Sequence, residues 1–397
     1  MAWSKKTWVS LGVGTAVLLA VLLFYRAVWG DVPTLVAALD HCDELFCDFT
    51  RQYYPTGQAL FETGQPSNGY FYTTAFALLM AVFARFELGT TVLLWGIFQL
   101  AALGLLFAAG YDLLERTHPA RWLYWPLLLL SMPVMHNLKW GQVSIFVTGC
   151  ILGTLALYRR GHGKAAMGLL VLGTAVKYYA ALFLIYFLIK REWRLLLLFG
   201  LFSVLLIGVL PLALLGFDTN WQFYQFMSER IAHARSTWML TDINSQNLGH
   251  LLARLRDPQP ISQPLWQGIG YALAGGGLAL AWLRLRRSGD ACAPLFWTIL
   301  LLSLPLFVET SWPHYFVYLP FAQVLLLQTV WSDKWPRPAK IVGLMLVAIS
   351  ILLSTMPFFM LWDDWRPFER WGMLFWANAA LLLCWYLSQS SIVNRQS

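Results

Sequence analysis

Long apolar runs constrain this chain more than any other feature of its sequence. The runs lie at about 8–29, 72–86, 90–111, 122–135, 141–158, 165–189, 194–215, 266–283, 293–308, 315–331, 341–361 and 371–387. A helix needs roughly 20 apolar residues to cross a bilayer, and most of these runs approach that length. They are continuous and do not alternate residue by residue, which argues against a transmembrane barrel. The pattern predicts an all-α integral membrane protein.

The composition agrees with this prediction and excludes a soluble enzyme. The 397 residues are 58% hydrophobic and 12% charged, whereas soluble domains carry about 25% charged residues. We expect one polytopic membrane domain over 1–397. The first run, 8–29, follows Lys5 and Lys6 and lacks a small-x-small cleavage site, which favours a retained signal anchor over a cleaved signal peptide.

The basic residues indicate the orientation of the chain. Short cytoplasmic loops of membrane proteins retain an excess of Lys and Arg. In the best assignment the inner segments carry a net charge of +12 and the outer segments −6, and Arg26 and Lys177 within the runs bring the total to +8. The basic surplus is therefore a topology signal and requires no nucleic acid. It predicts about 12 crossings, both termini in the cytoplasm, and two long outer loops at 30–71 and 216–265.

Two runs do not fit simple crossings under this assignment. The loops on either side of 72–86 are both outer, so this run should lie in the interface or re-enter the membrane. The segments RRGHGK (159–164) and KREWR (190–194) are both inner, so 165–189 should form a buried helical hairpin with Lys177 near its turn.

The first outer loop contains one carboxylate in an unusual setting. For Asp31, Asp40, Asp43, Glu44 and Glu62 a solvated acidic surface is sufficient explanation. Asp48 instead stands among apolar and aromatic residues in LFCDFTRQYY, where it could cap a helix or act as a base.

The same loop contains Cys42 and Cys47, the only close pair among five cysteines. A disulfide between them requires a turn, because a continuous helix holds residues five apart beyond the ~7 Å Cα separation that a disulfide spans. The sequence leaves open whether this bridge forms.

Three cationic or titratable residues fall at outer ends of apolar runs. Lys177 is the strongest candidate for a functional role, since a lone lysine in a largely apolar run is energetically expensive. Lys139 in HNLKWGQ could equally snorkel at a helix end, and His314 in SWPHYF could be a satisfied interfacial histidine.

A set of short motifs in order along the chain resembles glycosyltransferase family 87, membrane mannosyltransferases of the GT-C superfamily that use polyprenyl-phosphate sugars. The motifs are DFTRQYYPTGQALFETGQP, LKWGQVSIF, GLLVLGTAVKYYA, NSQNLGHLLARL and SWPHYFVYLP, and they extend from Asp48 to Pro320. The family's YPP-like segment corresponds here to YFYTTAF, which lacks both prolines, and its Lys-x-x-Pro corresponds to Lys177 without the proline.

The resemblance implies a GT-C fold, with interfacial helices in the first outer loop, and a role for individual residues. Asp48 would be the catalytic base. The donor phosphate would contact Lys177 and His314, with Lys139 and Arg51 as further candidates. The sugar and acceptor cavity would include Tyr53, Tyr54, Gln142 and Asn247. Residues 1–215, including the outer loop 30–89, would form the catalytic module, and 216–397 an outer loop, 216–265, plus variable helices.

The resemblance implies transfer of a sugar, mannose in this family, from a polyprenyl-phosphate donor to a lipid or glycan acceptor, by a single-base inverting mechanism. No DxD sequence occurs in the chain, so we expect neither a metal site nor another cofactor. The expected location is the bacterial inner membrane, with the active site on its outer face. The main alternative is a transporter or flippase of a lipid-linked or anionic substrate, and a structural assembly protein is a second one.

Overall fold

The computed structural model describes residues 44–393 apart from 68, 238, 240, 257–261, 333, 334 and 363, together with isolated positions such as Leu39 and Cys42. The predicted anchor at 8–29 lies almost wholly outside this part, as do Lys5, Lys6, Asp31, Asp40 and Asp43.

The described chain is entirely helical, as the sequence predicts, and contains no strand. Six of its helical segments are long and apolar enough to cross a membrane: Leu88–Leu113, Trp193–Ala234, Leu265–Arg287, Gly289–Phe307, Arg337–Ser354 and Trp365–Gln389. Four shorter apolar helices accompany them, at Thr74–Phe83, Ser144–Arg159, Gly163–Val176 and Tyr178–Ile189. The protein is therefore a multi-pass membrane protein, although the described part has fewer full-length helices than the predicted number of crossings.

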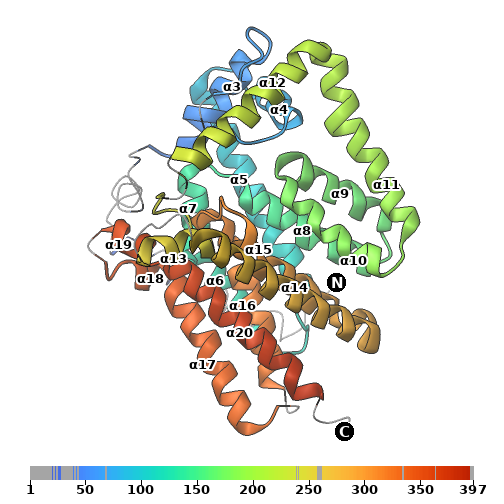
Figure 1. The fold of residues 1–397 in the computed structure, drawn as a ribbon, viewed down its shortest axis with the longest axis vertical. Helices are drawn as coiled ribbons and strands as arrows, with labels where there is room; N and C mark the ends of the chain where they lie inside the picture. The colour runs from blue at the N-terminus through green and yellow to red at the C-terminus, as the bar shows by residue number, and fades with distance from the viewer. Residues whose placement is uncertain are drawn as a thin grey trace, which may run out of the picture.

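The amino-terminal half places its longer helices side by side, with α5 against α8, α8 against α9, and α9 against α11 (Figure 1). The elements of this half are η1 (Phe49–Tyr53), α3 (Tyr54–Ala59), α4 (Thr74–Phe83), α5 (Leu88–Leu113), η2 (Pro119–Leu123), α6 (Tyr124–Leu129), α7 (Met132–Trp140), α8 (Ser144–Arg159), α9 (Gly163–Val176), η3 (Tyr178–Phe183), α10 (Leu184–Ile189), α11 (Trp193–Ser203), η4 (Val204–Val209) and α12 (Leu210–Thr237).

The carboxyl-terminal half forms a second group, in which α14 packs on α15, and α20 packs on α15, α16 and α17. Its elements are α13 (Leu248–Arg256), α14 (Ser262–Ser288), η5 (Gly289–Cys292), α15 (Ala293–Phe307), η6 (Pro313–Tyr318), α16 (Leu319–Trp331), α17 (Arg337–Ser354), α18 (Met356–Phe359), α19 (Trp365–Arg370) and α20 (Met373–Val393). The two halves meet where η6 contacts α7 and α8, and where α16 contacts α6.

Prolines explain why several apolar runs fold as short helices instead of single long ones. Pro133 begins α7, Pro313 begins η6, and Pro320 begins α16. Proline lacks a backbone N–H and so fits the first turn of a helix, but it interrupts a helix that would continue through it. The breaks at 130–131 and 308–312 therefore free the chain to turn near the junction of the two halves.

The 72–86 run contains only a short helix. Its helix, α4, has 10 residues, which span only about 15 Å and cannot cross a bilayer. Thr73 caps this helix by accepting a hydrogen bond from the backbone N–H of Phe76 at 3.2 Å. The helix packs against α3 and α12, so this segment covers one end of the molecule.

The hairpin predicted for 165–189 is also present. Helix α9 ends at Val176, Lys177 adopts an extended conformation, and η3 and α10 return. A Cβ at Gly163, where α9 begins, would lie 3.0 Å from Leu195, which follows the hairpin. Both inner segments thus lie at the same end of the molecule.

Labelling of single cysteines tests whether these two segments also share one side of the membrane. In a Cys292→Ser background, we expect cysteines at His162 and Arg194 to react with a membrane-impermeant maleimide only after the membrane is permeabilised. A cysteine at Glu62 should react in intact spheroplasts. Opposite sidedness of His162 and Arg194 would show that 165–189 crosses the membrane once.

Candidate active site

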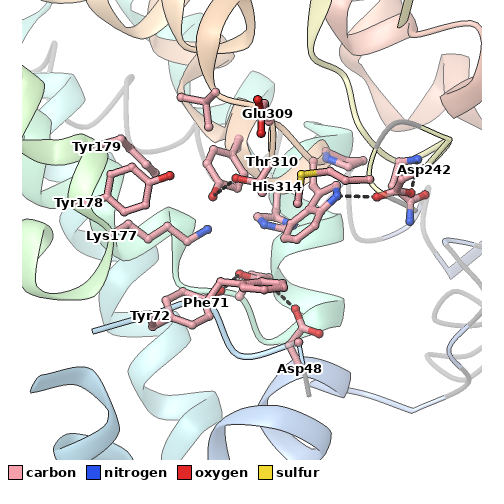
Figure 2. A pocket seen from close by; sticks show the side chains of 18 of the residues that line it. Asp48, Phe71, Tyr72, Lys177, Tyr178, Tyr179, Asp242, Glu309, Thr310 and His314 are labelled. Carbon is pink, nitrogen blue, oxygen red and sulfur yellow. Dashed lines mark hydrogen bonds between the residues drawn. The ribbon is translucent and has the colours of Figure 1, made fainter. Parts of the chain in front are cut away.

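A cavity of about 880 Å³ opens where the two halves meet (Figure 2). Its walls include Asp48, Gln142 and Lys177 from the amino-terminal half and His314 from the carboxyl-terminal half. Four residues that the sequence singled out are thus brought together, although they are spread over more than 260 positions of the chain. The cavity is the candidate active site.

Asp48 faces this cavity and is not a helix cap. The residue precedes η1 and makes no capping hydrogen bond to it. Its carboxylate accepts hydrogen bonds from the side-chain amides of Gln52, at 2.9 Å, and Gln142. The side chain is only 7% exposed. Amide donors stabilise the ionised carboxylate at this depth without protonating it.

Gln142 is held rigidly by a network of buried groups. Its side-chain oxygen accepts hydrogen bonds from the hydroxyls of Tyr53, at 3.0 Å, and Tyr72, at 2.9 Å. Its backbone carbonyl accepts bonds from the side-chain amides of Gln99 and Asn137, each at 2.8 Å. Because the two tyrosine hydroxyls bond the oxygen of the Gln142 amide, its NH₂ group points to the Asp48 carboxylate. The network therefore orients Asp48, the candidate base.

Gly141 allows Gln142 to reach this position. Gly141 ends α7 in the left-handed region, with φ of 65°. A Cβ added there would lie 2.9 Å from Cβ of Phe46 and 3.0 Å from Nε1 of Trp95. The chain then turns so that α8 begins at Ser144 beside the cavity. Only glycine satisfies both the backbone conformation and the close approach.

Lys177 occupies the break between α9 and η3 and is 5% exposed. Its ammonium donates a hydrogen bond to Oγ of Ser144 at 3.1 Å and lies 3.9 Å from the ring centre of Tyr315. Among the described residues no carboxylate forms an ion pair with it. A buried cation with one hydroxyl partner and an aromatic face retains donors for an anion.

His314 adds two ring nitrogens to the cavity. It lies on η6, is 3% exposed, and neither ring nitrogen has a hydrogen-bond partner among the described residues. Its ring stacks on that of His136 with centroids 5.7 Å apart. Buried polar atoms are normally satisfied, so these nitrogens are available to a bound ligand.

Comparison with known proteins agrees with this geometry. The family model for glycosyltransferase family 87 matches residues 70–312, which is more than half of the chain. The chain belongs to glycosyltransferase family 87.

A curated relative adds a more distant similarity. The chain is 24% identical, over 271 residues, to a polyprenol-phosphate-mannose-dependent alpha-(1-2)-phosphatidylinositol mannoside mannosyltransferase of Mycobacterium tuberculosis. The match covers 65% of this chain and 59% of the relative, so the chain spans well under two thirds of the relative's length. No solved structure matches the chain.

The other residues that the family resemblance suggested do not line the cavity. Arg51 is exposed and pairs with Glu44 at 3.0 Å. Lys139 is buried, with its Nζ 5.0 Å from the ring centre of Trp140. Tyr54 donates a hydrogen bond to the backbone carbonyl of Phe86 at 3.0 Å. Their assignment to the donor phosphate or the sugar stays a prediction.

Asn247 and Tyr53 support the site from behind. The Asn247 side-chain oxygen accepts the backbone N–H of Gly249 at 2.9 Å, immediately after the start of α13. Its amide bonds the carbonyl of Pro305 at 3.2 Å. Tyr53 acts through Gln142, as described above. Both contribute to the geometry of the cavity wall, and direct contact with a sugar stays a prediction.

The cavity of this family 87 protein also includes residues that the sequence reading did not select. His136 and Trp140 come from α7, Asp242 comes from the loop between α12 and α13, and Glu309 and Trp312 come from the loop between α15 and η6. Asp242 accepts a hydrogen bond from Nε1 of Trp312 at 2.8 Å, which fixes the indole at the cavity wall (Figure 2). Tryptophan is common at membrane interfaces, so only the proximity of Trp312 to His314 in SWPHYF could have singled it out.

The outer loop that contains Asp242 is tied to α13. Oγ of Ser245 lies 2.8 Å from Nδ1 of His250 and also bonds the carbonyl of Glu309 at 3.0 Å. Burial, with the Arg254 guanidinium nearby, lowers the pKa of His250 to about 4, so this imidazole stays neutral at physiological pH. The hydrogen bond between Ser245 and His250 thus holds this loop with a neutral imidazole.

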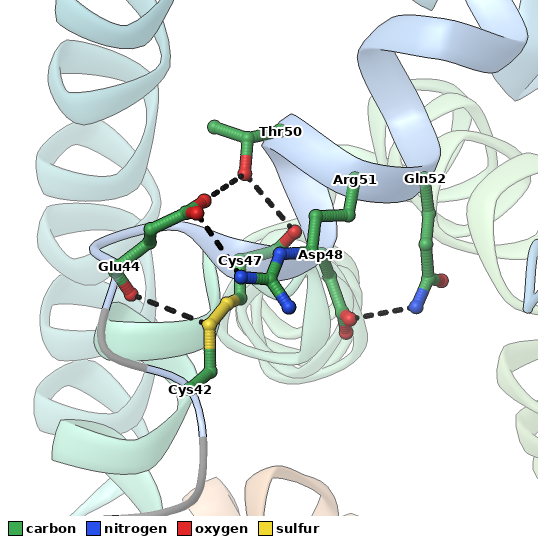
Figure 3. Close-up of a disulfide and its surroundings, with 7 residues drawn as sticks. All are labelled: Cys42, Glu44, Cys47, Asp48, Thr50, Arg51 and Gln52. Carbon is green, nitrogen blue, oxygen red and sulfur yellow. Dashed lines mark hydrogen bonds and ion pairs between the residues drawn. A yellow bond between two sulfur atoms is a disulfide. The ribbon is translucent and has the colours of Figure 1, made fainter. Parts of the chain in front are cut away.

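Cys42 and Cys47 form a disulfide beside Asp48 (Figure 3). Their Cα atoms are 6.7 Å apart. The turn that the bridge requires is supplied by Phe46, whose φ is 62°. The backbone N–H of Phe46 donates to the carbonyl of Lys139 at 2.6 Å. The segment that precedes Asp48 is therefore held against α7.

Replacement of Gly141 tests how strongly the site depends on this turn. Gly141→Ala should destabilise the protein by about 2–5 kcal/mol, because left-handed strain adds to steric overlap with Phe46. It should also reduce activity by displacing Gln142. The matched control is Gly161→Ala, which shares the positive φ but meets nothing within 4 Å and should cost about 1 kcal/mol. Equal unfolding temperatures for the two variants would contradict this account.

Proposed function

We propose that this protein is a membrane glycosyltransferase that moves mannose from a polyprenyl-phosphate donor to a hydroxyl of a lipid or glycan acceptor. The observation that carries the proposal is that one cavity contains both a buried carboxylate, Asp48, and a buried ammonium, Lys177. The two groups do not form an ion pair with each other. Membership of family 87 supports the reaction class.

The arrangement suits a single-base inverting displacement. Asp48 accepts the proton of the acceptor hydroxyl while the oxygen of that hydroxyl forms a bond to the anomeric carbon of the sugar. The bond from that carbon to the phosphate oxygen breaks on the opposite face, and the departing polyprenyl phosphate takes the electron pair. A phosphate leaves as a stable anion, so no general acid is needed. Cationic and hydrogen-bonding donors stabilise the charge that develops on it.

Lys177 and His314 supply those donors. The Lys177 ammonium has capacity beyond its bond to Ser144, and the His314 ring offers an N–H that no described residue accepts. Two donors from different halves of the chain would hold the phosphate across the cavity and so orient the anomeric carbon toward Asp48. We assign no step to a metal, since the donor phosphate can be neutralised by these side chains.

The proposal extends to substrates and location. The Mycobacterium tuberculosis relative is named for a polyprenol-phosphate-mannose donor and a phosphatidylinositol mannoside acceptor, which supports mannose as the sugar and a glycolipid as the acceptor. We place the protein in a bacterial inner membrane in a GT-C fold with about 12 crossings and cytoplasmic termini. The cavity then faces the outer side.

In this proposal both parts of the chain supply residues to the cavity. Residues 1–215, as the catalytic module, contribute Asp48 and Lys177, while 216–397 contribute His314 and the Trp312 wall. The second part is thus more than a variable appendage in this proposal, because it supplies one side of the phosphate site.

Asp48→Asn tests the assignment of the base. The amide keeps the shape of the side chain but cannot accept a proton, so transfer from labelled polyprenyl-phosphate mannose should fall by about 10²–10⁴-fold with donor binding retained. Glu44→Gln is the matched control, because Glu44 is exposed on the same loop and pairs only with surface groups. It should leave transfer near wild type. Substantial activity in Asp48→Asn would place the base elsewhere.

Lys177→Ala tests the phosphate site. We expect a higher apparent KM for the polyprenyl-phosphate sugar, since the ammonium binds its phosphate in the ground state. We also expect a lower kcat, because the interaction strengthens as charge develops on the departing phosphate. Lys177→Arg should not restore activity, because a planar fork replaces a compact ammonium. Lys164→Ala, an exposed lysine at the start of α9, should behave as wild type. Unchanged donor KM in Lys177→Ala would overturn this role.

A further inference from the structure

A second cavity, of about 620 Å³, lies at the other end of the same helices. Helix α8 begins at Ser144 beside the catalytic cavity and ends at Arg159 in the second one. Its 16 residues separate the two by roughly 20 Å. Helix α15 likewise begins at the second cavity and ends at Phe307 in the first. The two cavities therefore occupy opposite ends of the bundle.

The second cavity is lined by an excess of positive charge. Four arginines line it, Arg116, Arg159, Arg160 and Arg284, together with two carboxylates, those of Asp112 and Glu115. They come from α5 and the loop after it, from the end of α8 and from the end of α14. The charge distribution of the sequence predicts that these segments face the cytoplasm.

The carboxylates do not neutralise the arginines one for one. Asp112 is shared by Arg160, at 2.5 Å, and Arg116, at 3.4 Å. Glu115 accepts a hydrogen bond from Thr117 at 3.3 Å. Arg159 forms no ion pair with a described residue, although the Asp290 carboxylate lies close enough to interact with it electrostatically. Among the described residues, Arg159 and Arg284 thus have no carboxylate in direct contact.

Arg284 is constrained by burial as well as by charge. One of its terminal nitrogens donates to Oε1 of Gln389 at 3.1 Å, but its Nε is buried and has no hydrogen-bond partner among the described residues. An unsatisfied buried donor on a charged group is unfavourable. An acceptor within the cavity would relieve this cost.

The helical segment formed by η5 and α15 begins at the same place. Cys292, the last residue of η5, and Pro294 of α15 line the cavity. The positive end of a helix dipole favours an anion there. Leu295 and Leu325 add apolar atoms to the cavity lining, which an acyl chain could contact.

We propose that this cavity binds the phosphate headgroup of an anionic membrane lipid, with Arg159 and Arg284 as its principal ligands. Guanidinium groups bind phosphate oxygens in a bidentate manner, and basic pockets between the cytoplasmic ends of membrane helices suit anionic headgroups. The lipid would join α8, α14 and α15 at the end remote from the catalytic cavity. This inference does not depend on the sugar transferred or on the acceptor.

Native mass spectrometry of the purified full-length protein tests the proposal. The protein is titrated with phosphatidylglycerol, with phosphatidylcholine as a zwitterionic comparison, and separately with polyprenyl phosphate. We expect the anionic lipids to bind at least 10-fold more tightly than phosphatidylcholine, and the doubly substituted Arg159→Ala, Arg284→Gln protein to lose this preference. Arg287→Ala, an exposed arginine of α14 that does not line the cavity, should bind as wild type.

Cys292 provides a second readout that is specific to this cavity. It is a free cysteine and is not buried, whereas Cys150 and Cys384 are buried. A bound headgroup should slow alkylation of Cys292 by about 10-fold in the wild-type protein and have no effect in Arg159→Glu. This single variant replaces the doubly substituted protein as the test if the latter unfolds. Protection by phosphatidylglycerol identifies a bulk phospholipid, and protection by polyprenyl phosphate alone identifies the carrier lipid. Equal binding of phosphatidylcholine, or unprotected Cys292 with lipid bound, would overturn the proposal.

Discussion

Two opposite charges buried in one cavity impose the main constraint on this structure. Asp48 and Lys177 do not form an ion pair with each other, so each needs separate compensation in an environment poor in water. The carboxylate accepts hydrogen bonds from two side-chain amides. The ammonium donates a hydrogen bond to the Ser144 hydroxyl and lies over the ring of Tyr315. An uncompensated buried charge costs several kcal/mol. The surrounding elements must therefore be positioned so that these contacts form.

Those contacts require interruptions between the long helices. Lys177 lies in an extended break, Gly141 is left-handed, and His314 follows Pro313 in a short helix. Each break leaves backbone groups that lipid cannot satisfy, which is tolerated only where protein surrounds them. The full-length helices of both halves provide that enclosure, and the short helices carry the chemistry.

The arrangement also separates the two ends of the bundle by their charge chemistry. One end combines a carboxylate with a lysine and a histidine in one cavity. The other end collects arginines, which remain charged at any physiological pH. Helix α15 has one terminus in each cavity, and α8 connects the second cavity to Ser144, the hydrogen-bond partner of Lys177.

Much of the site was predictable from local sequence, because its residues stand out against an apolar background. Asp48 among aromatic residues, Lys177 in a 25-residue apolar run and His314 beside Pro313 were each identifiable by their rarity in such settings. Trp312 was not, since tryptophan is common at membrane interfaces. Arg51 and Lys139 were further candidates for the donor phosphate, and only the fold shows that they do not line the cavity.

The sequence by itself determined that the chain is helical and that it lies in a membrane, and it predicted that the runs 72–86 and 165–189 do not cross that membrane. Apolar length and charge parity carry these inferences, and both are read from the sequence without tertiary contacts. Only the tertiary structure decided that residues of the two halves share one cavity, that Gln142 presents its amide to Asp48, and that Cys42 and Cys47 meet across the turn at Phe46. The first two depend on contacts between segments far apart in the chain, whose pairing no local pattern encodes. The third depends on a left-handed backbone conformation at Phe46, which the sequence left open.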